Sequence, residues 1–339
     1  MNLSQNIRHF ANLGLYLNTN SESLSQTIWT AYQANKWFTP ANIEFAFSAI
    51  AQRFLQENLL EQWVENYPFL YQTETYSPKK IALIMAGNIP LAGFHDWLCV
   101  LLSGNIALVK SSSKDAVLLK HLANYLGKIA PELADKTIFV EGKLPDFDAI
   151  IATGSNNTNR YFQYYFGKYP HILRNNRNSL AVLPADMSNR AWQQLGIDIF
   201  TYFGLGCRNV AKLLLPPNIS PAVALENLQD FHSVKDHDKY KNNYDYLLSI
   251  LLLNNVPHWA NDFLILQESS QLASPIASLH FEYYQNEDDL QEKLAAHSAQ
   301  TQCIVGAHEA YTHFGEAQLP TLAQYADNID TMAFLGQLK

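Results

Sequence analysis

Three segments of this 339-residue chain carry side chains whose types and spacing could do chemistry. In the first, Gly204-Leu205-Gly206-Cys207-Arg208-Asn209, two glycines allow a tight turn just before a thiol. Arg208 places a positive charge beside the thiol, which favours the nucleophilic thiolate. The pattern fits a catalytic cysteine or a structural turn. Cys99 and Cys303 lie in apolar runs, where a free cysteine behaves as a small hydrophobic residue.

The second segment is Gly87-Asn88, which follows an apolar run at residues 80–85. The Asn88 amide could donate to a developing oxyanion without titrating, or Asn88 could serve a turn because asparagine tolerates left-handed backbone. The third is Lys110 with the serines at 111–113, after the apolar run at residues 106–109. A lysine beside hydroxyls suits contacts with ribose or phosphate.

Two weaker candidates complete the set. Thr153-Gly154-Ser155 ends an apolar run and opens a helical pattern, so its N–H groups could meet a cofactor, or Ser155 could simply cap the helix. His95 and Asp96 are adjacent, but neighbouring residues on a helix point in different directions, which disfavours a catalytic pair.

The elements that must position these side chains follow from apolar periodicity. Residues 1–78 are predicted to be helical, with Thr39-Pro40 as a helix start. Short apolar strands at 80–85, 106–109, 137–140 and 148–152 then alternate with helices, which predicts a parallel α/β sheet. Ligands of such sheets bind beyond the carboxyl ends of the strands, where the polar segments after the first, second and fourth of these strands lie.

A second α/β segment begins near Ala181. We therefore expect a helical region plus nucleotide-binding domain over 1–180 and a catalytic domain over 181–305. We expect residues 306–339 to pack back or to contribute to oligomerisation. The charged stretch Ser233–Asn243 is predicted to be a solvated loop.

Composition excludes several classes of function. Lys plus Arg number 23 and Asp plus Glu number 31, a net charge of −8, so the chain has no global attraction for nucleic acid. No apolar run is long enough for a membrane span, and the N-terminus lacks a signal-peptide core. There is no CxxC or HExxH pattern, so no metal is expected, and three scattered cysteines suit a reducing cytoplasm. GxGxxG and Walker A loops are also absent.

In their order along the chain, these motifs resemble those of the aldehyde dehydrogenase superfamily. Its PWNFP and AGNTVVLKPSE runs are similar to Ala86–Pro90 and Ser103–Ser113, and its FTGS turn to Ala152–Ser155. Its GQxC loop is similar to Gly204–Cys207, and its late EEIFGPV segment to Ser270–Ile276. The LuxC-type acyl-CoA reductase branch is more similar still, and the segments that carry this resemblance are Gly87–Asp96, Gly206–Val210, Phe314-Gly315, Pro320 and Tyr325–Asp327.

The resemblance implies an aldehyde dehydrogenase-like α/β fold and a role for each candidate. Cys207 would be the acyl-accepting nucleophile, and its backbone N–H would join the Asn88 amide in holding the oxyanion. The residues implied to bind the cofactor are Lys110, Ser112 and Ser113 near the adenosine ribose, Gly154 and Ser155 along the nicotinamide and pyrophosphate path, and Gln271 near the nicotinamide ribose.

Three glutamates of the superfamily are replaced. Leu173–Arg177 stands where a glutamate normally activates water, which suits an enzyme that must keep its thioacyl intermediate from hydrolysis. Ser113 replaces a glutamate that would repel a 2′-phosphate, which indicates NADPH over NADH. Gln271 replaces the glutamate of the late motif.

The sequence therefore predicts an NADPH-dependent reductase, a homo-oligomer, that converts an acyl-CoA thioester to the fatty aldehyde through a cysteine thioacyl intermediate. Two alternatives stay open. One is an oxidative aldehyde dehydrogenase, either CoA-acylating or hydrolytic. The other is a catalytically silent α/β protein that binds a nucleotide.

Overall fold

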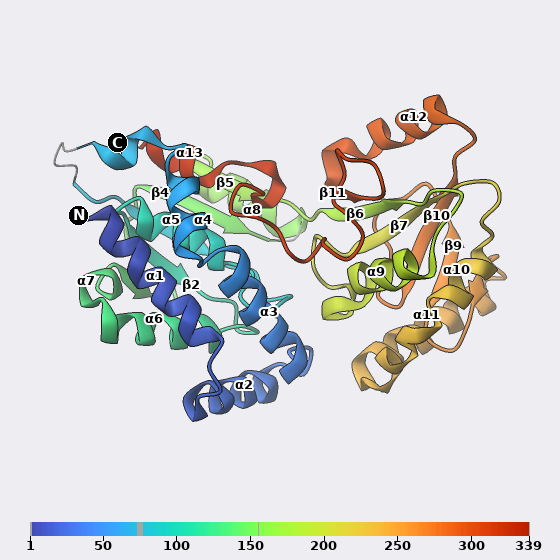
Figure 1. Ribbon diagram of the computed structural model, residues 1–339, viewed down its shortest axis with the longest axis horizontal. Helices are drawn as coiled ribbons and strands as arrows, with labels where there is room; N and C mark the ends of the chain where they lie inside the picture. Colours follow the sequence, from blue (N-terminus) through green and yellow to red (C-terminus); the bar gives the residue numbers. More distant parts are fainter. Residues whose placement is uncertain (1, 73–76, 155, 339) are drawn as a thin grey trace. The chain divides into compact units, whose positions relative to one another are not determined.

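The computed structural model describes residues 2–72, 77–154 and 156–338 (Figure 1). The chain divides into two compact units. Unit 1 runs up to Asn176 and takes in the chain again from Pro320 onward, whereas unit 2 is the continuous stretch Arg177–Leu319. Within the described ranges, no helix has the length and apolar character needed to cross a membrane.

Unit 1 is built on a parallel sheet of strand order β3-β2-β1-β4-β5. Its strands are β1 (Lys80–Ile84), β2 (Ile106–Lys110), β3 (Thr137–Phe139), β4 (Ala149–Thr153) and β5 (His171–Arg174). The first four match predicted strands, and β5 was not predicted. The strand order reverses between β1 and β4, and a sheet of this kind binds ligands at the carboxyl ends of the strands beside that point.

Helices cover both faces of this sheet. Those of unit 1 are α1 (Leu3–Leu17), α2 (Glu22–Ala34), α3 (Pro40–Arg53), α4 (Glu57–Val64), α5 (Phe94–Leu102), α6 (Leu118–Ile129), α7 (Pro131–Ala134), α8 (Asn156–Phe166) and α13 (Thr331–Gly336). Successive strand residues point to opposite faces. Ile81 and Leu83 thus join the core that includes α1, α5 and α6, while Ala82 faces Phe162 and Phe166 of α8.

A capping residue sets the start of α3, as the sequence predicted. Thr39 accepts a hydrogen bond from the Asn42 N–H at 3.3 Å, with Pro40 in the first turn of α3, which confirms the predicted helix start. Cys99, on α5, is fully buried, in agreement with its expected role as a small core residue.

Unit 2 contains a second sheet, of order β11-β6-β7-β10-β9-β8, in which only the β8–β9 pair is antiparallel among the described pairs. Its strands are β6 (Asn178–Val182), β7 (Val210–Leu215), β8 (Trp259–Ala260), β9 (Ile265–Glu268), β10 (Ser278–Tyr283) and β11 (Thr301–Val305). Its helices are α9 (Asn189–Phe200), α10 (Pro221–Asn227), α11 (Asp238–Leu253) and α12 (Glu287–His297). The α/β prediction is thereby confirmed for both units.

The prediction of a solvated loop over Ser233–Asn243 is wrong. A 3₁₀ helix, Gln229–Asp236, leads directly into α11, which begins at Asp238. The reason is Tyr240, which is 2 % exposed and donates its hydroxyl to the Phe263 carbonyl at 3.1 Å. One buried aromatic side chain thus anchors a segment whose other residues are mainly polar.

Candidate active site

Cys207 lies in unit 2 on a turn that connects α9 to β7. After α9 ends, Tyr202, Phe203 and Gly204 have φ values of 54°, 58° and 76°. Three consecutive residues in the left-handed region reverse the chain sharply, and for Tyr202 and Phe203 this conformation is strained. Strain of this kind persists only where surrounding contacts maintain it. Cys207 lies a few residues after this strained segment and is half-buried.

The Cys207 turn is tied to a segment more than a hundred residues further along the chain. Arg208 donates through Nε to the Ala317 carbonyl at 2.5 Å. Asp198, fully buried on α9, accepts from the N–H groups of Gly315 and Ala317 at 2.7 and 2.9 Å. The structure therefore joins two sequence motifs, the cysteine loop and Phe314-Gly315, within one unit.

Burial raises the pKa of Asp198 to about 7, although its two backbone donors act in the opposite direction. Sequence patterns did not point to Asp198, because a single aspartate near the end of an amphipathic helix normally faces solvent.

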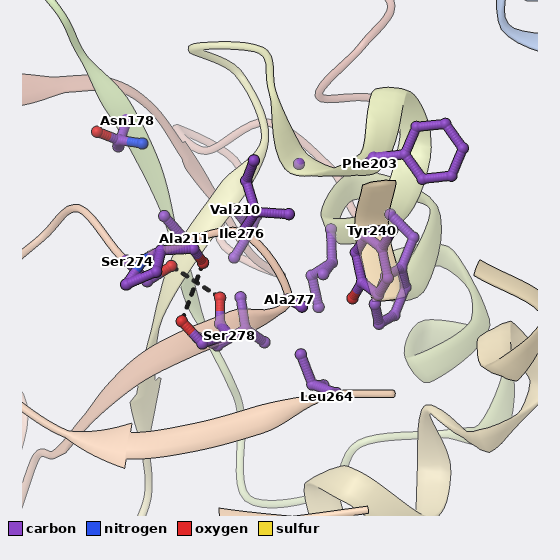
Figure 2. A pocket seen from close by; sticks show the side chains of 15 residues that line it. Asn178, Phe203, Val210, Ala211, Tyr240, Leu264, Ser274, Ile276, Ala277 and Ser278 are labelled. Atoms are coloured by element: carbon purple, nitrogen blue, oxygen red, sulfur yellow. Dashed lines mark hydrogen bonds between the residues drawn. The ribbon is translucent and has the colours of Figure 1, made fainter. Parts of the chain in front are cut away.

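A small hollow lies beside Phe203 and Gly204, in the turn that precedes Cys207 (Figure 2). About 40 Å³ of it is space that a water molecule can enter. Figure 2 shows Phe203 and Tyr240 on one side and Ser274 with Ser278 on the other. The Ser274 hydroxyl donates to the Ser278 carbonyl at 2.8 Å, and the Ser278 hydroxyl donates to the Pro275 carbonyl at 2.9 Å. These two hydrogen bonds make the serine side of the hollow more rigid. Apart from Asn178 and these serines, aliphatic and aromatic side chains dominate the lining.

In unit 1, the predicted site residues gather at the carboxyl ends of β1, β2 and β4. Asn88 follows β1 and is exposed. Gly87 lies against Ser112, since a Cβ added to Gly87 would lie 2.5 Å from Ser112 Oγ. The two loops that the sequence singled out separately are therefore in contact. Asn88 and Cys207 belong to different units.

A buried carboxylate supports the Asn88 loop. Leu91 has a left-handed backbone with φ 57°, and its N–H donates to Asp115 Oδ2 at 2.8 Å. Asp115 Oδ1 is buried and has no hydrogen-bond partner among the described residues. Burial raises the pKa of Asp115 to about 7, because the Leu91 N–H offsets only part of the desolvation.

Around β2, Lys110 donates through Nζ to the Gly142 carbonyl. Ser112 accepts from the Lys114 N–H at 3.2 Å, and Ser113 is exposed. The Ser111 hydroxyl is buried and lacks a hydrogen-bond partner within the described part of the chain. This orphaned polar group lies next to Lys110 in sequence and marks the end of β2 as a place where a polar ligand would fit.

At the end of β4, Gly154 lies close to Thr158 and Phe162 of α8, and a Cβ there would be 2.9 Å from the Phe162 ring. Ser155 lies outside the described residues. Gln271 is in unit 2, exposed after β9, and its carbonyl accepts from His280 Nδ1 at 3.0 Å and from Lys212 Nζ at 3.4 Å.

Lys212 is a residue that the sequence interpretation missed. It is fully buried on β7, pairs with Glu282 of β10, and donates to the Ser269 carbonyl at 2.9 Å. Burial lowers the pKa of Lys212, while Glu282 opposes that shift. A lysine inside the apolar run Val210–Leu215 was the available signal, because a buried cation needs a partner.

His95 and Asp96 point to different partners, as predicted. Asp96 Oδ1 accepts from Arg174 Nη2 at 2.6 Å and from the Thr331 hydroxyl at 3.1 Å. His95 stacks on Phe54 with ring centroids 4.9 Å apart, and burial lowers its pKa to about 4. These side chains therefore hold the interior of unit 1 together. Across the described ranges, no group of three or more His, Cys, Asp or Glu side chains is placed to hold a metal ion.

The fold is that of the aldehyde dehydrogenases. Similar solved structures include an NADP-dependent enzyme from E. coli (TM-score 0.65, 14 % identity, 93 % of this chain and 75 % of that one). Aldehyde dehydrogenase 21 from Physcomitrella patens, in complex with the reaction product succinate, has a TM-score of 0.67 at 11 % identity over 91 % of this chain and 74 % of that one. An aldehyde dehydrogenase from Mycobacterium tuberculosis, complexed with NAD⁺, has a TM-score of 0.65 at 13 % identity over 91 % and 74 % of the two chains.

A family model described as acyl-CoA reductase (LuxC) matches residues 20–215, more than half of the chain. The chain belongs to the LuxC acyl-CoA reductase family, which confirms the resemblance found in the sequence, and it is an oxidoreductase that acts on aldehyde or acyl groups. No curated protein matches the sequence.

Proposed function

We propose that the protein reduces an acyl-CoA thioester to the aldehyde with NADPH, through a thioacyl intermediate on Cys207. The observation that carries this proposal is the setting of Cys207, a half-buried thiol that follows a strained left-handed turn in a chain of the LuxC family. Strained backbone is concentrated at functional sites, where the surrounding structure must maintain it.

In the proposed reaction, the Cys207 thiolate attacks the carbonyl carbon of the thioester and forms a new S–C bond. The carbonyl oxygen becomes an oxyanion that accepts hydrogen bonds from the Cys207 backbone N–H and from the Asn88 amide. Collapse of the tetrahedral state breaks the bond between carbon and the sulfur of coenzyme A, which leaves as a thiolate. Because an amide does not titrate near neutral pH, Asn88 remains a donor throughout.

The proposed cofactor-binding residues come from unit 1 and from the loop after β9. The residues proposed to hold the nicotinamide cofactor are Lys110, Ser112, Ser113, Gly154, Ser155 and Gln271. The orphaned hydroxyl of Ser111 fits this group, because a buried hydroxyl beside a lysine can be satisfied by a ribose or phosphate oxygen. Bound there, the cofactor supplies the hydride that reduces the thioacyl carbon. Ser113, exposed and uncharged, leaves room for a 2′-phosphate.

Protection from water is the other requirement of a reductase. In the segment Leu173–Arg177, Arg174 is engaged with Asp96, and the Asn175 N–H donates to Asp327 Oδ2 at 3.1 Å. Asparagine has no useful basicity near neutral pH, so this segment itself cannot deprotonate a water molecule. Asp327 is a carboxylate that contacts the segment, and it is therefore the first residue to test if hydrolysis occurs.

Incubation with acyl-CoA in the absence of reductant tests the proposal. We expect intact-protein mass spectrometry to show one added acyl group, lost on addition of NADPH or excess coenzyme A. Cys207→Ala should take up no acyl group and form no aldehyde, while Cys99→Ala and Cys303→Ala should react as the parent does. Aldehyde formation by Cys207→Ala at the parent rate would show that the proposed nucleophile is wrong.

The same experiment distinguishes the proposed reductase from the alternative functions that the sequence left open. Rapid release of free acid would indicate a hydrolytic enzyme, and its loss in Asp327→Asn would identify the base. No acylation with a series of chain lengths, together with retained cofactor binding, would indicate a nucleotide-binding protein without this activity.

A further inference from the structure

We propose that Asn209 and Ser179 are positioning residues that orient the backbone N–H of Cys207 as an oxyanion donor. The inference rests on the function proposed above, in which that N–H holds the oxyanion. It starts from two buried polar side chains, each of which bonds to the backbone on one side of Cys207.

Asn209 holds the chain before the cysteine. Its side chain is 1 % exposed, and its Oδ1 accepts from the Gly206 N–H at 2.8 Å. Its Nδ2 donates to three carbonyls at the end of α9, those of Asp198 at 3.0 Å, Ile199 at 3.2 Å and Thr201 at 2.8 Å. The amide therefore fastens the cysteine turn to the C-terminal end of the helix and satisfies carbonyls that helix ends leave unpaired.

The Asn209 backbone holds the next peptide group. Its N–H donates to the Gly206 carbonyl at 3.1 Å. This carbonyl and the Cys207 N–H belong to the same planar peptide unit and point in opposite directions. Fixing the carbonyl toward Asn209 therefore fixes the direction in which the Cys207 N–H points.

Ser179 holds the peptide that follows the cysteine. It is fully buried on β6, and its hydroxyl lies 3.0 Å from the Cys207 carbonyl, to which it donates. A serine hydroxyl has one proton and two acceptor positions. Its acceptor positions meet the Cys303 N–H at 3.2 Å and the Cys303 thiol at 3.1 Å, so Cys303 is the donor in both contacts.

Together, the two side chains restrain the peptide groups on either side of the Cys207 Cα. A donor held in place before the reaction needs no reorganisation when the oxyanion forms, and this is the source of its catalytic effect. The chemistry of the side chains matters here. Only a carboxamide can accept from Gly206 through one end and donate to the α9 carbonyls through the other, and aspartate would place an oxygen against those carbonyls.

The experiment compares two reactions of the same thiol. Transfer of an acyl group from acyl-CoA passes through an oxyanion, whereas alkylation by iodoacetamide does not. Ser179→Ala should slow single-turnover acylation by about 10-fold to 100-fold, less than the typical loss of an entire oxyanion donor. Its KM should stay near the parent value, and its alkylation rate and alkylation pH profile should be unchanged. Asn209→Asp should also slow acylation without changing the alkylation rate, and its effect on acylation should be larger than that of Ser179→Ala.

Cys303→Ala is the matched control, because it removes the thiol that contacts Ser179 but keeps the bond from Ser179 to Cys207. Its rates in both reactions should stay within about twofold of the parent. If Asn209→Asp does not fold, Ser179→Ala decides the question, since it removes a single oxygen from a buried site.

The inference is overturned if Ser179→Ala acylates at the parent rate, or if acylation and alkylation fall together, which would show a general disturbance of the thiol. A parent protein that alkylates but never accepts an acyl group would instead contradict the proposed function, so the two failures are distinguishable.

Discussion

Gly87 lies so close to Ser112 that even one added carbon would overlap it, at 2.5 Å from Oγ and 2.6 Å from Cβ. The loop that carries Asn88 and the loop proposed to contact the cofactor ribose therefore adjust to each other. A glycine is required at this position by space, because the contact leaves no room for a side chain.

Gly87→Ala should therefore lower the free energy of unfolding by about 1–3 kcal/mol, the usual effect of forcing an extra group into a packed site. It should also weaken cofactor binding, measured by titration of protein fluorescence, because the Ser112 loop must shift. The double variant Gly87→Ala/Ser112→Gly removes the overlap and should recover most of the stability. No recovery in the double variant would show that the loss comes from another contact.

Asn88→Ala should reduce kcat by roughly 10²–10³, the typical effect of removing one oxyanion donor, with little change in KM. Because Asn88 is exposed, its replacement should leave the midpoint of thermal unfolding nearly unchanged. Steady-state kinetics with acyl-CoA at saturating NADPH provides the measurement. A raised KM at constant kcat would instead assign Asn88 to binding of the ground state.

Ser113→Glu should shift the preference from NADPH toward NADH, since a carboxylate accepts from a ribose 2′-hydroxyl and repels a 2′-phosphate. The readout is the ratio of kcat/KM for the two cofactors. Ser113→Gln supplies the control, because it has nearly the same size without the charge and should produce a much smaller shift. A parent protein that uses both cofactors equally well would remove the reason for assigning this role to Ser113.

Asp115 should make the protein less stable as the pH rises. Its pKa is raised from 3.8 to about 7 in the folded state, so between these values the folded chain holds a proton that the unfolded chain has lost. The free energy of unfolding should therefore fall between pH 4 and pH 7 and stay lower above that.

Asp115→Asn keeps an oxygen for the Leu91 N–H but removes the titration. Urea unfolding at pH 5 and pH 8 should show a decrease in the parent that is larger than in the variant by on the order of 2 kcal/mol. Equal changes in the two proteins would mean that Asp115 remains ionised in the fold.

The sequence predicted four of the five strands in the sheet of unit 1, because these four are short and mainly apolar. β1 and β2 coincide with predicted runs to within one residue, and the polar loops after them lie at the expected ends of the strands. This reliability has a physical basis, since a parallel strand covered on both faces leaves a continuous apolar signal. The weakly apolar β5 gives no such signal and was not predicted.

The supports of the candidate site could not be predicted in the same way. Cys207 and Asn88 were identified because they stand in recognisable local patterns. Asp198 and Ser179 instead act through partners that lie 28 to 124 residues away along the chain. Such contacts depend on the register of the strands and the direction of α9, which neither composition nor periodicity specifies.

The return of the chain to unit 1 constrains the order in which the protein can fold during synthesis. The core of this unit includes Leu322, Tyr325, Met332 and Leu335, and Tyr325 accepts a hydrogen bond from Trp63 at 3.1 Å. These residues leave the ribosome only after all of unit 2, whose sequence is continuous. Unit 2 can therefore fold first, while part of the apolar surface of α1 to α8 remains exposed until the later residues are synthesised. We therefore expect the nascent chain to be most prone to aggregation after unit 2 has been made and before α13 emerges.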